Sequence, residues 1–327
     1  MIRAKNGMVF LMVVAFFLMI LAGTGGVVNA ASKYPKKNIK WIVMWRAGGG
    51  ADTATRIFIK QFEKFIGKKA IVNNITGGAA TVGYLAAKTA KPDGYTLVTI
   101  QGDLPKFEIM KLAPIAIDDF DILPSFAYQS PVIAVRADAP WKTVEDFVAD
   151  AQKRPEKIAV GITDIGGIYH QPLVLWEEMA GFRIKPVFHK SSPAQTASLL
   201  GGHVDANITW VRPNISYVKE GKIRFLAYMS IRRHPDYPDV PTLREKGWDV
   251  HYEHPYGVGG PKGLPEEVKK IISEATMKVW DVPEFEKDLA KVGLSVFRLD
   301  GPAYTRHIKN MQKNSARAIK IINERKK

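Results

Sequence analysis

Apolar and polar positions follow two patterns along the chain, short apolar runs and longer stretches with helical spacing. The short runs predict strands at residues 39–45, 70–72, 95–100, 131–135, 158–162, 187–188, 204–208, 223–229 and 252–258. The amphipathic stretches predict helices, among them residues 53–66, 194–200, 265–280, 284–292 and 302–324. Strands that alternate with helices are typical of α/β folds with parallel sheets. We therefore expect two α/β halves without a flexible linker.

The first predicted strand is separated from the first helix by Gly48, Gly49 and Gly50. Glycines allow a tight turn and a close approach of the backbone to a ligand. A helix start offers free N–H groups and partial positive charge, which suit a carboxylate or a phosphate. Asp52 is predicted as the helix N-cap, which contributes about 1 kcal/mol; a role in positioning ligand or water is the other interpretation. The pattern predicts an anion site.

The N-terminal segment has the pattern of an export signal. Arg3 and Lys5 precede an apolar run at residues 8–21, and small residues then lead to Ala30 and Ala31. This run is shorter than the ~20 residues of a membrane-spanning helix, and the order of features is typical of a cleaved secretory signal peptide. Without a cysteine, the chain has neither a lipid anchor nor disulfides. We expect residues 1–31 to be a signal peptide and the mature protein to be periplasmic.

The chain is strongly basic, with 47 Lys and Arg against 32 Asp and Glu, a formal charge of +15. Removal of Arg3 and Lys5 leaves +13. An exported protein rarely meets nucleic acid, so we expect no nucleic-acid partner. The charge instead favours an anionic ligand or an acidic surface on a membrane partner.

Catalytic and cofactor motifs are absent from the sequence. The glycine run lacks the Gly-Lys-Ser/Thr of a P-loop, Thr53 breaks a G-x-G-x-x-G pattern, and there is no G-x-S-x-G. On a predicted strand, His251 and His254 would face opposite sides, so we expect no metal site. We expect no cofactor and no enzymatic activity. An exported α/β hydrolase is the alternative from another class.

Six short motifs occur in a fixed order: GGGAD at 48–52, NNITGG at 73–78, PDGYTL at 92–97, LLGGHVD at 199–205, GKIR at 221–224 and PDVPT at 238–242. With Tyr34-Pro35, they make nearly the whole mature chain resemble the Bug-type substrate-binding proteins of tripartite tricarboxylate transporters. The resemblance implies a two-lobed type II periplasmic binding protein fold, the Venus flytrap, with hinge strands between the lobes near residues 131–135 and 252–258. It indicates residues 32–130 with 256–327 as lobe 1 and 131–255 as lobe 2.

The resemblance also implies a solute-binding protein that captures a small organic carboxylate between its lobes and delivers it to the membrane subunits of such a transporter. We expect a monomer. In the family, one carboxylate is held by the two glycine loops. Carried over to this sequence, those positions are Gly48, Gly49, Gly50, Asp52, Gly77 and Gly78.

The chain departs from the family pattern at Trp45-Arg46, at residues 164–168 and at Thr209-Trp210. Arg46 could pair with a carboxylate through its planar fork or remain a solvated rim charge. Trp45 and Trp210 could stack on an aromatic ligand or pack in a core. An aromatic carboxylate is therefore the alternative to an aliphatic one, and a co-receptor that presents ligand to a membrane sensor is a further alternative.

Four other positions complete the candidate ligand-binding set. Asp164 lies in one of the altered loops, and His170 occupies a position that is often His in the family. His170 either lines the ligand cleft or is a satisfied histidine at a helix start. Ser191 and Ser192 precede a helix and either donate hydrogen bonds to a ligand or cap that helix.

Overall fold

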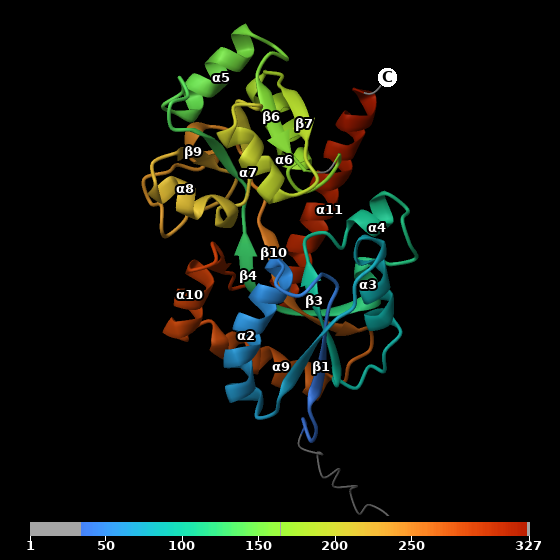
Figure 1. Cartoon of the computed structure of the whole chain (residues 1–327). Helices are drawn as coiled ribbons and strands as arrows, with labels where there is room; N and C mark the ends of the chain where they lie inside the picture. The colour runs from blue at the N-terminus through green and yellow to red at the C-terminus, as the bar shows by residue number, and fades with distance from the viewer. Residues whose placement is uncertain (1–33, 164, 326–327) are drawn as a thin grey trace, which may run out of the picture. The chain divides into compact units, whose positions relative to one another are not determined.

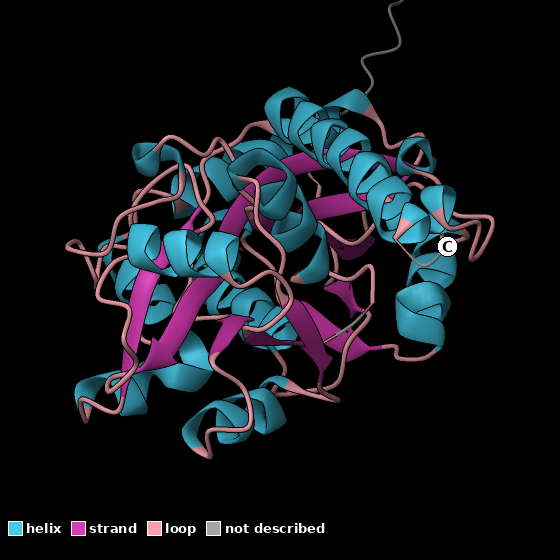
Figure 2. Ribbon diagram, turned by 90° about the horizontal axis from the view of Figure 1, so that it is seen from above, coloured by secondary structure: helices cyan, strands magenta, loops and turns pink. Residues whose placement is uncertain are grey.

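The computed structural model describes residues 34–163 and 165–325. The predicted signal peptide and Asp164 therefore lie outside the described residues. Lys37–Lys327 forms one compact unit, of which residues 37–163 and 165–325 are described. Two β-sheets run through this unit, and helices lie on both sides of the strands (Figure 2).

The larger sheet has six strands in the order β11-β4-β10-β3-β1-β2. They are β1 (Ile39–Val43), β2 (Ala70–Asn74), β3 (Thr96–Gln101), β4 (Phe120–Gln129), β10 (His254–Pro261) and β11 (Ser295–Val296). β1 pairs in parallel with β2 and β3, whereas β10 is antiparallel to both β3 and β4. The prediction of parallel sheets is thus wrong in part for both sheets, because β10 here and β5 (Val132–Arg136) in the smaller sheet each run antiparallel to both neighbouring strands.

Helices cover this sheet with aromatic and aliphatic side chains. They are α2 (Gly50–Ile66), α3 (Thr81–Lys88), α4 (Lys106–Ile109), α9 (Glu266–Val279), α10 (Pro283–Ala290) and α11 (Gly301–Glu324), with 3₁₀ turns η1 (Gly78–Ala80) and η2 (Ile117–Asp119). Under α2, Phe58 stacks on Phe126 at 4.2 Å between ring centroids and lies 5.6 Å from Trp41. Burial of such rings contributes about 2 kcal/mol each, which fixes α2, and therefore its N-terminus, on the sheet.

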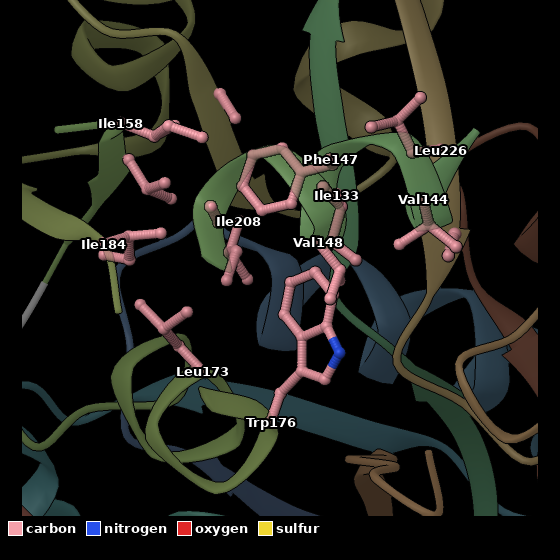
Figure 3. Packing of buried hydrophobic residues seen from close by; sticks show 14 of the residues in the cluster. Ile133, Val144, Phe147, Val148, Ile158, Leu173, Trp176, Ile184, Ile208 and Leu226 are labelled. Carbon is pink, nitrogen blue, oxygen red and sulfur yellow. The ribbon is translucent and has the colours of Figure 1, made fainter. Parts of the chain in front are cut away.

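The smaller sheet has five strands in the order β7-β6-β8-β5-β9. They are β5 (Val132–Arg136), β6 (Ala159–Ile162), β7 (Lys185–Phe188), β8 (Ala206–Thr209) and β9 (Ile223–Tyr228). Its helices are α5 (Val144–Lys153), α6 (His170–Ala180), α7 (Ser192–Leu200) and α8 (Ile215–Lys219), with 3₁₀ turns η3 (Arg212–Asn214) and η4 (Arg244–Lys246). A separate core lies here, in which Phe147 of α5 stacks on Trp176 of α6 at 5.8 Å (Figure 3).

Three connections join the two sheets. The chain passes from β4 to β5 at Ser130 and Pro131, and it returns from β9 to β10. The long helix α11, red in Figure 1, packs on both: Tyr304 donates to the Ile100 carbonyl of β3 (2.8 Å), and Ser315 donates to Gln171 of α6 (2.7 Å).

The ten-residue strand β4 is missing from the predicted elements. It contains Pro124, which cannot donate to a β-ladder and favours bulges or edges. The register between β4 and β10 does shift on either side of Ser125, whose N–H donates to Leu299 outside the sheet (2.9 Å). The bulge accommodates the proline within an otherwise buried strand.

Candidate functional site

The first glycine loop leads directly into the N-terminus of α2. Gly48 has φ of +78°, which a residue with a side chain rarely adopts. Gly49 is the N-cap, and the first helical bond runs from Thr53 N–H to the Gly49 carbonyl (2.9 Å). The N–H groups of Gly50, Ala51 and Asp52 precede this bond and so have no partner within the helix. Gly50 is exposed, so the start of the helix faces solvent at this residue, whereas Ala51 and Asp52 are buried.

The predicted N-cap role of Asp52 is wrong. The left-handed turn at Gly48 lets the helix begin earlier, which places Asp52 in its first turn with a buried side chain. Its carboxylate accepts from Gly48 N–H, Arg56 Nε and Asn74 Nδ2, each at 2.9 Å. Burial alone raises the pKa of Asp52, but these hydrogen bonds and the Arg56 charge together hold it below its ordinary value. Asp52 is therefore ionised, and its carboxylate fixes the first glycine loop.

Asn74 extends this network to the second glycine loop. It ends β2 opposite Val43 of β1, and its amide also donates to the Trp45 carbonyl (2.9 Å). Parallel strands bring both loops to the same edge of the sheet. The second loop then turns sharply, because Gly77 and Gly78 have φ of +128° and +53°. Their exposed backbone is held by Thr81 Oγ1, which donates to the Gly78 carbonyl (2.6 Å).

Tyr256 and His254 of β10 connect the two groups of loops, and the sequence did not identify either residue. The Tyr256 hydroxyl accepts from Gln129 Nε2 (2.6 Å) and lies 3.5 Å from the position that a Cβ at Gly50 would occupy. Burial raises the pKa of Tyr256, so its O–H stays a donor. The His254 ring centroid is 5.4 Å from that of Tyr256 and 5.9 Å from that of Trp210.

Two buried donors or acceptors beside Tyr256 have no hydrogen-bond partner among the described residues. They are Nδ1 of His254 and Nε2 of Gln101, and both side chains are more than nine-tenths buried. Gln101 pairs directly with Tyr256 across the antiparallel ladder, so the two side chains share one face of the sheet. Burial lowers the pKa of His254 to about 4, which keeps the ring neutral near pH 7. The region beneath α2 thus holds unsatisfied polar groups without adding charge.

The other predicted residues lie on the loops of the smaller sheet. Trp210 meets Tyr169 edge to face at 5.0 Å, and the Tyr169 hydroxyl is 3.2 Å from Ser192 Oγ. Ser191 accepts from Ala194 N–H (3.4 Å) and caps α7, which confirms the capping interpretation.

His170, the first residue of α6, is buried and satisfied locally, because its Nδ1 accepts from Gly166 N–H (3.0 Å). Its ring lies 5.6 Å from the ring of Phe188, edge to face. Phe188 is exposed at the end of β7 and was not among the predicted site residues.

Trp45 and Arg46 are both exposed beside the first glycine loop. The Lys106 ammonium lies 5.5 Å from the centre of the Trp45 ring, within the range of a cation–π contact, and also pairs with Asp103 at 3.1 Å. The Arg46 carbonyl accepts from Gly49 N–H (3.1 Å), so its backbone shapes the loop.

The structure therefore groups Trp45, Arg46, Asp52 and the two glycine loops on the larger sheet, and His170, Ser191, Ser192 and Trp210 on the smaller one. The second group is connected to Gly50 of the first by three rings in successive contact, those of Trp210, His254 and Tyr256. Sequence spacing could not reveal this link, because Gln129 and Tyr256 meet only through sheet pairing.

His251 and His254 do not lie on one strand as predicted, since β10 begins at His254. His251 Nδ1 instead lies 2.8 Å from the buried Glu253 carboxylate. No group of three or more metal-ligating side chains occurs in residues 34–163 and 165–325.

A groove of about 470 Å³ lies elsewhere, between α9 and the start of α11, and contains none of the predicted site residues. Its Lys262 and Lys269 are paired with Asp121 and Glu266, at 3.2 and 2.5 Å. These pairs compensate its basic charge, so it does not compete with the glycine loops as an anion site.

The sequence matches the Tripartite tricarboxylate transporter family receptor, TctC, over residues 54–326. The chain belongs to this family. The TctC family is a family of solute-binding receptors and not of enzymes, which confirms the expectation from the sequence. The predicted resemblance to Bug-type proteins is confirmed as well.

Individual relatives match the chain over most of its length. It is 28% identical to a Cupriavidus necator protein, "UPF0065 protein in gbd 5'region", with 84% of each chain covered. It is 26% identical to BugT of Bordetella pertussis, covering 78% of this chain and 80% of BugT. A Polaromonas TctC solute binding protein has a TM-score of 0.80 and 30% identity, covering 88% and 99% of the two chains.

These likenesses confirm the predicted two-lobed type II periplasmic binding protein fold. TctC proteins are periplasmic binding proteins. Within the described residues, no helix has both the length and the apolar character that crossing a bilayer requires.

Proposed function

We propose that this protein is an extracytoplasmic solute-binding protein that captures a small organic carboxylate for a tripartite tricarboxylate-type secondary transporter. The observation that carries the proposal is the start of α2. Three backbone N–H groups precede the first helical bond there, and the Tyr256 hydroxyl lies beside Gly50. Aligned N–H groups at a helix start attract a carboxylate through hydrogen bonds and through the helix dipole.

The surroundings of α2 support a fixed site rather than one that forms around the ligand. Asp52 already links Gly48, Arg56 and Asn74, so the first loop needs little ordering when an anion binds. The unpartnered polar atoms of Gln101 and His254 lie on the strands beneath it. A preorganised site loses less conformational entropy on binding, which favours affinity.

Known structures of the same fold are consistent with a carboxylate. A Rhodopseudomonas palustris protein with adipate has a TM-score of 0.72 at 20% identity, and MatC of the same organism, with bound malate, has 0.69 at 19%. At such identity the likeness concerns the fold alone. Those ligands show that the fold accommodates carboxylates, and the helix start gives the reason in this chain.

In this proposal, the predicted site residues surround the ligand, except that Asp52 positions the loops and Ser191 caps α7. The lobes are residues 32–130 with 256–327 and residues 131–255, a division that the membership of the two sheets supports except at His254 and Pro255, which belong to β10 of the larger sheet. The protein is exported with cleavage of residues 1–31, acts as a monomer and docks onto the membrane subunits of the transporter.

Calorimetric titration of the mature chain tests the carboxylate site. We expect micromolar binding of at least one of adipate, hexanoate and 3-phenylpropionate, and no binding of the corresponding amides. Gly50→Ala should lower every carboxylate affinity at least tenfold, about 1.4 kcal/mol, because its methyl group fills the space between α2 and Tyr256.

Gly201→Ala, at the end of α7, is the matched control, because Gly201 has ordinary backbone angles and its nearest neighbour is the exposed His203 side chain. It should bind as the unmodified protein does. Binding of the amides, or of none of the acids, would refute the carboxylate site. Uptake by vesicles that contain the membrane subunits, dependent on added binding protein, tests the transporter assignment separately.

A further inference from the structure

Large apolar side chains are exposed at the edges of the sheets where the candidate site lies. Trp45 follows β1 and Val82 contacts the second glycine loop, while Ile165 follows β6 and Phe188 ends β7. They are four of ten exposed large apolar residues among those described. Parallel strands β6, β7 and β8 end at one edge of their sheet, and in α/β proteins ligands bind at such carboxyl edges.

The aromatic rings on the smaller sheet contact neighbouring rings without parallel stacking. Trp210 is half-buried against Tyr169 and His254, at 5.0 and 5.9 Å. Phe188 meets His170 edge to face at 5.6 Å. Edge-to-face contacts fix the orientation of a ring while leaving part of its surface available for another apolar group.

We propose that the bound carboxylate carries an aromatic or otherwise apolar body, which contacts Trp210, Phe188 and Ile165 while its carboxylate lies at the start of α2. The inference rests on the proposed carboxylate site and specifies the ligand that this site takes. An apolar body removes exposed apolar surface from water on both ligand and protein. A second carboxylate at the same place would lose its hydration against carbon surfaces.

Two cationic side chains on the same loops define the alternative ligand, a dicarboxylate. Arg212 begins η3, and Lys190 lies between β7 and α7; both are exposed. The Arg212 backbone N lies 3.1 Å from the position of a Cβ at Gly293, which places that backbone against the α10–β11 connection. A dicarboxylate that reached Arg212 would make this residue, rather than the rings, the determinant of specificity.

Titration with three acids separates these ligands. Hexanoate and adipate share a six-carbon chain and differ in one terminal carboxylate, and 3-phenylpropionate adds a ring. We expect 3-phenylpropionate to bind at least tenfold more tightly than adipate, with hexanoate between them. Adipate binding as tightly as or more tightly than both others would overturn the apolar ligand while leaving the carboxylate site intact. Loss of an adipate preference in Arg212→Gln would then assign the second carboxylate to Arg212.

Absence of binding by all three acids would instead overturn the carboxylate site itself, and the apolar ligand with it. The two failures are therefore distinguishable.

A charge introduced on the apolar surface gives a test that misfolding cannot mimic. Phe188→Lys should weaken 3-phenylpropionate at least fivefold and strengthen adipate, because the new ammonium can pair with a second carboxylate. Phe65→Lys is the control, since Phe65 is exposed to a similar extent, 40% against 42%, but lies in the last turn of α2. It should leave both affinities unchanged. Equal effects of Phe188→Lys on the two acids would contradict the proposal.

Discussion

The loops of the two sheets present different chemistry to the same candidate site. Those of the larger sheet offer backbone groups, tied together by Asp52 through bonds to Gly48, Arg56 and Asn74. Those of the smaller sheet offer ring and aliphatic surface at Ile165, Phe188 and Trp210. Backbone donors recognise a carboxylate whatever it is attached to, whereas side-chain surface responds to the rest of the ligand. We therefore propose that anion holding and ligand selection belong to different lobes.

The largest expected effect concerns His254, which links the two groups of loops. Its pKa falls from an ordinary 6.5 to about 4 because the ring is buried. Below pH 6.5 the unfolded chain therefore gains a proton that the native protein does not. Stability should fall by about 3 kcal/mol as pH drops from 6.5 to 4, and this contribution should be absent in His254→Phe.

Urea unfolding of both proteins at pH 7 and pH 4 measures this contribution as a difference between variants. The comparison also cancels His251, whose pKa is raised first by its hydrogen bond to Glu253 and which therefore acts in the opposite direction. Parallel pH profiles would show that the pKa of His254 in the native protein is close to its ordinary value. The ring would then become cationic below pH 6.5 rather than stay neutral.

Asp52→Ala tests the rigidity of the first group. It removes the acceptor for Gly48 N–H and Asn74 Nδ2, so we expect a loss of about 2 kcal/mol in unfolding free energy. All carboxylate affinities should fall by a common factor, because the loops lose their shared link. The control is Asp146→Ala, which removes the capping box of α5 and should lower stability without changing any affinity. A change in ligand order in Asp52→Ala would break the division between the lobes.

Tyr256→Phe addresses the contact between the groups. It leaves Gln129 Nε2 without its acceptor and should cost about 1 kcal/mol of stability. Affinity should fall about fivefold for every carboxylate, about 1 kcal/mol, if the hydroxyl donates to the ligand. Tyr304→Phe removes a buried hydroxyl that bonds Ile100 and serves as control. The two variants should lose similar stability in thermal unfolding and should differ only in ligand affinity, measured by titration. Equal binding by the two variants would show that Tyr256 is not part of the site.

Arg46→Gln should have the smallest effect. Arg46 is exposed, so it acts through a screened field, and we expect about a twofold loss of affinity at low salt that disappears at high salt. Titrations at two ionic strengths measure it. A tenfold, salt-independent loss would show instead that Arg46 contacts the carboxylate directly.

The sequence predicted the parts of the site that depend on local conformation. Glycines after a strand and before an amphipathic helix gave the first loop, and the N-terminal segment of α7 gave the capping role of Ser191. The exact helix start was not predictable, because a left-handed Gly48 moves it ahead of Asp52. β4 was not predicted because it contains Pro124. A proline inside a strand needs a bulge, and the bulge becomes evident only once the pairing partner is known.

The parts missed in the site depend on long-range pairing. Tyr256 reaches Gln129 only because β4 and β10 are neighbours, and Gln101, whose Nε2 has no partner among the described residues, lies beside Tyr256 at the end of β3. Exposure of Phe188 follows from the packing of β7 at the sheet edge and has no signature in a two-residue apolar run. Site residues on loops were therefore easier to predict than site residues that strand pairing brings together.

The most direct measurement is a crossed titration of Gly50→Ala and Phe188→Ala with hexanoate, adipate and 3-phenylpropionate. We predict that Gly50→Ala lowers all three affinities by the same factor, at least tenfold, because its methyl group obstructs the common carboxylate. Phe188→Ala should leave the affinity for adipate nearly unchanged and lower the affinity for 3-phenylpropionate several-fold, which reduces the difference between the two affinities. If Gly50→Ala changes the order, or Phe188→Ala lowers all three equally, the assignment of anion holding and ligand selection to different lobes is wrong.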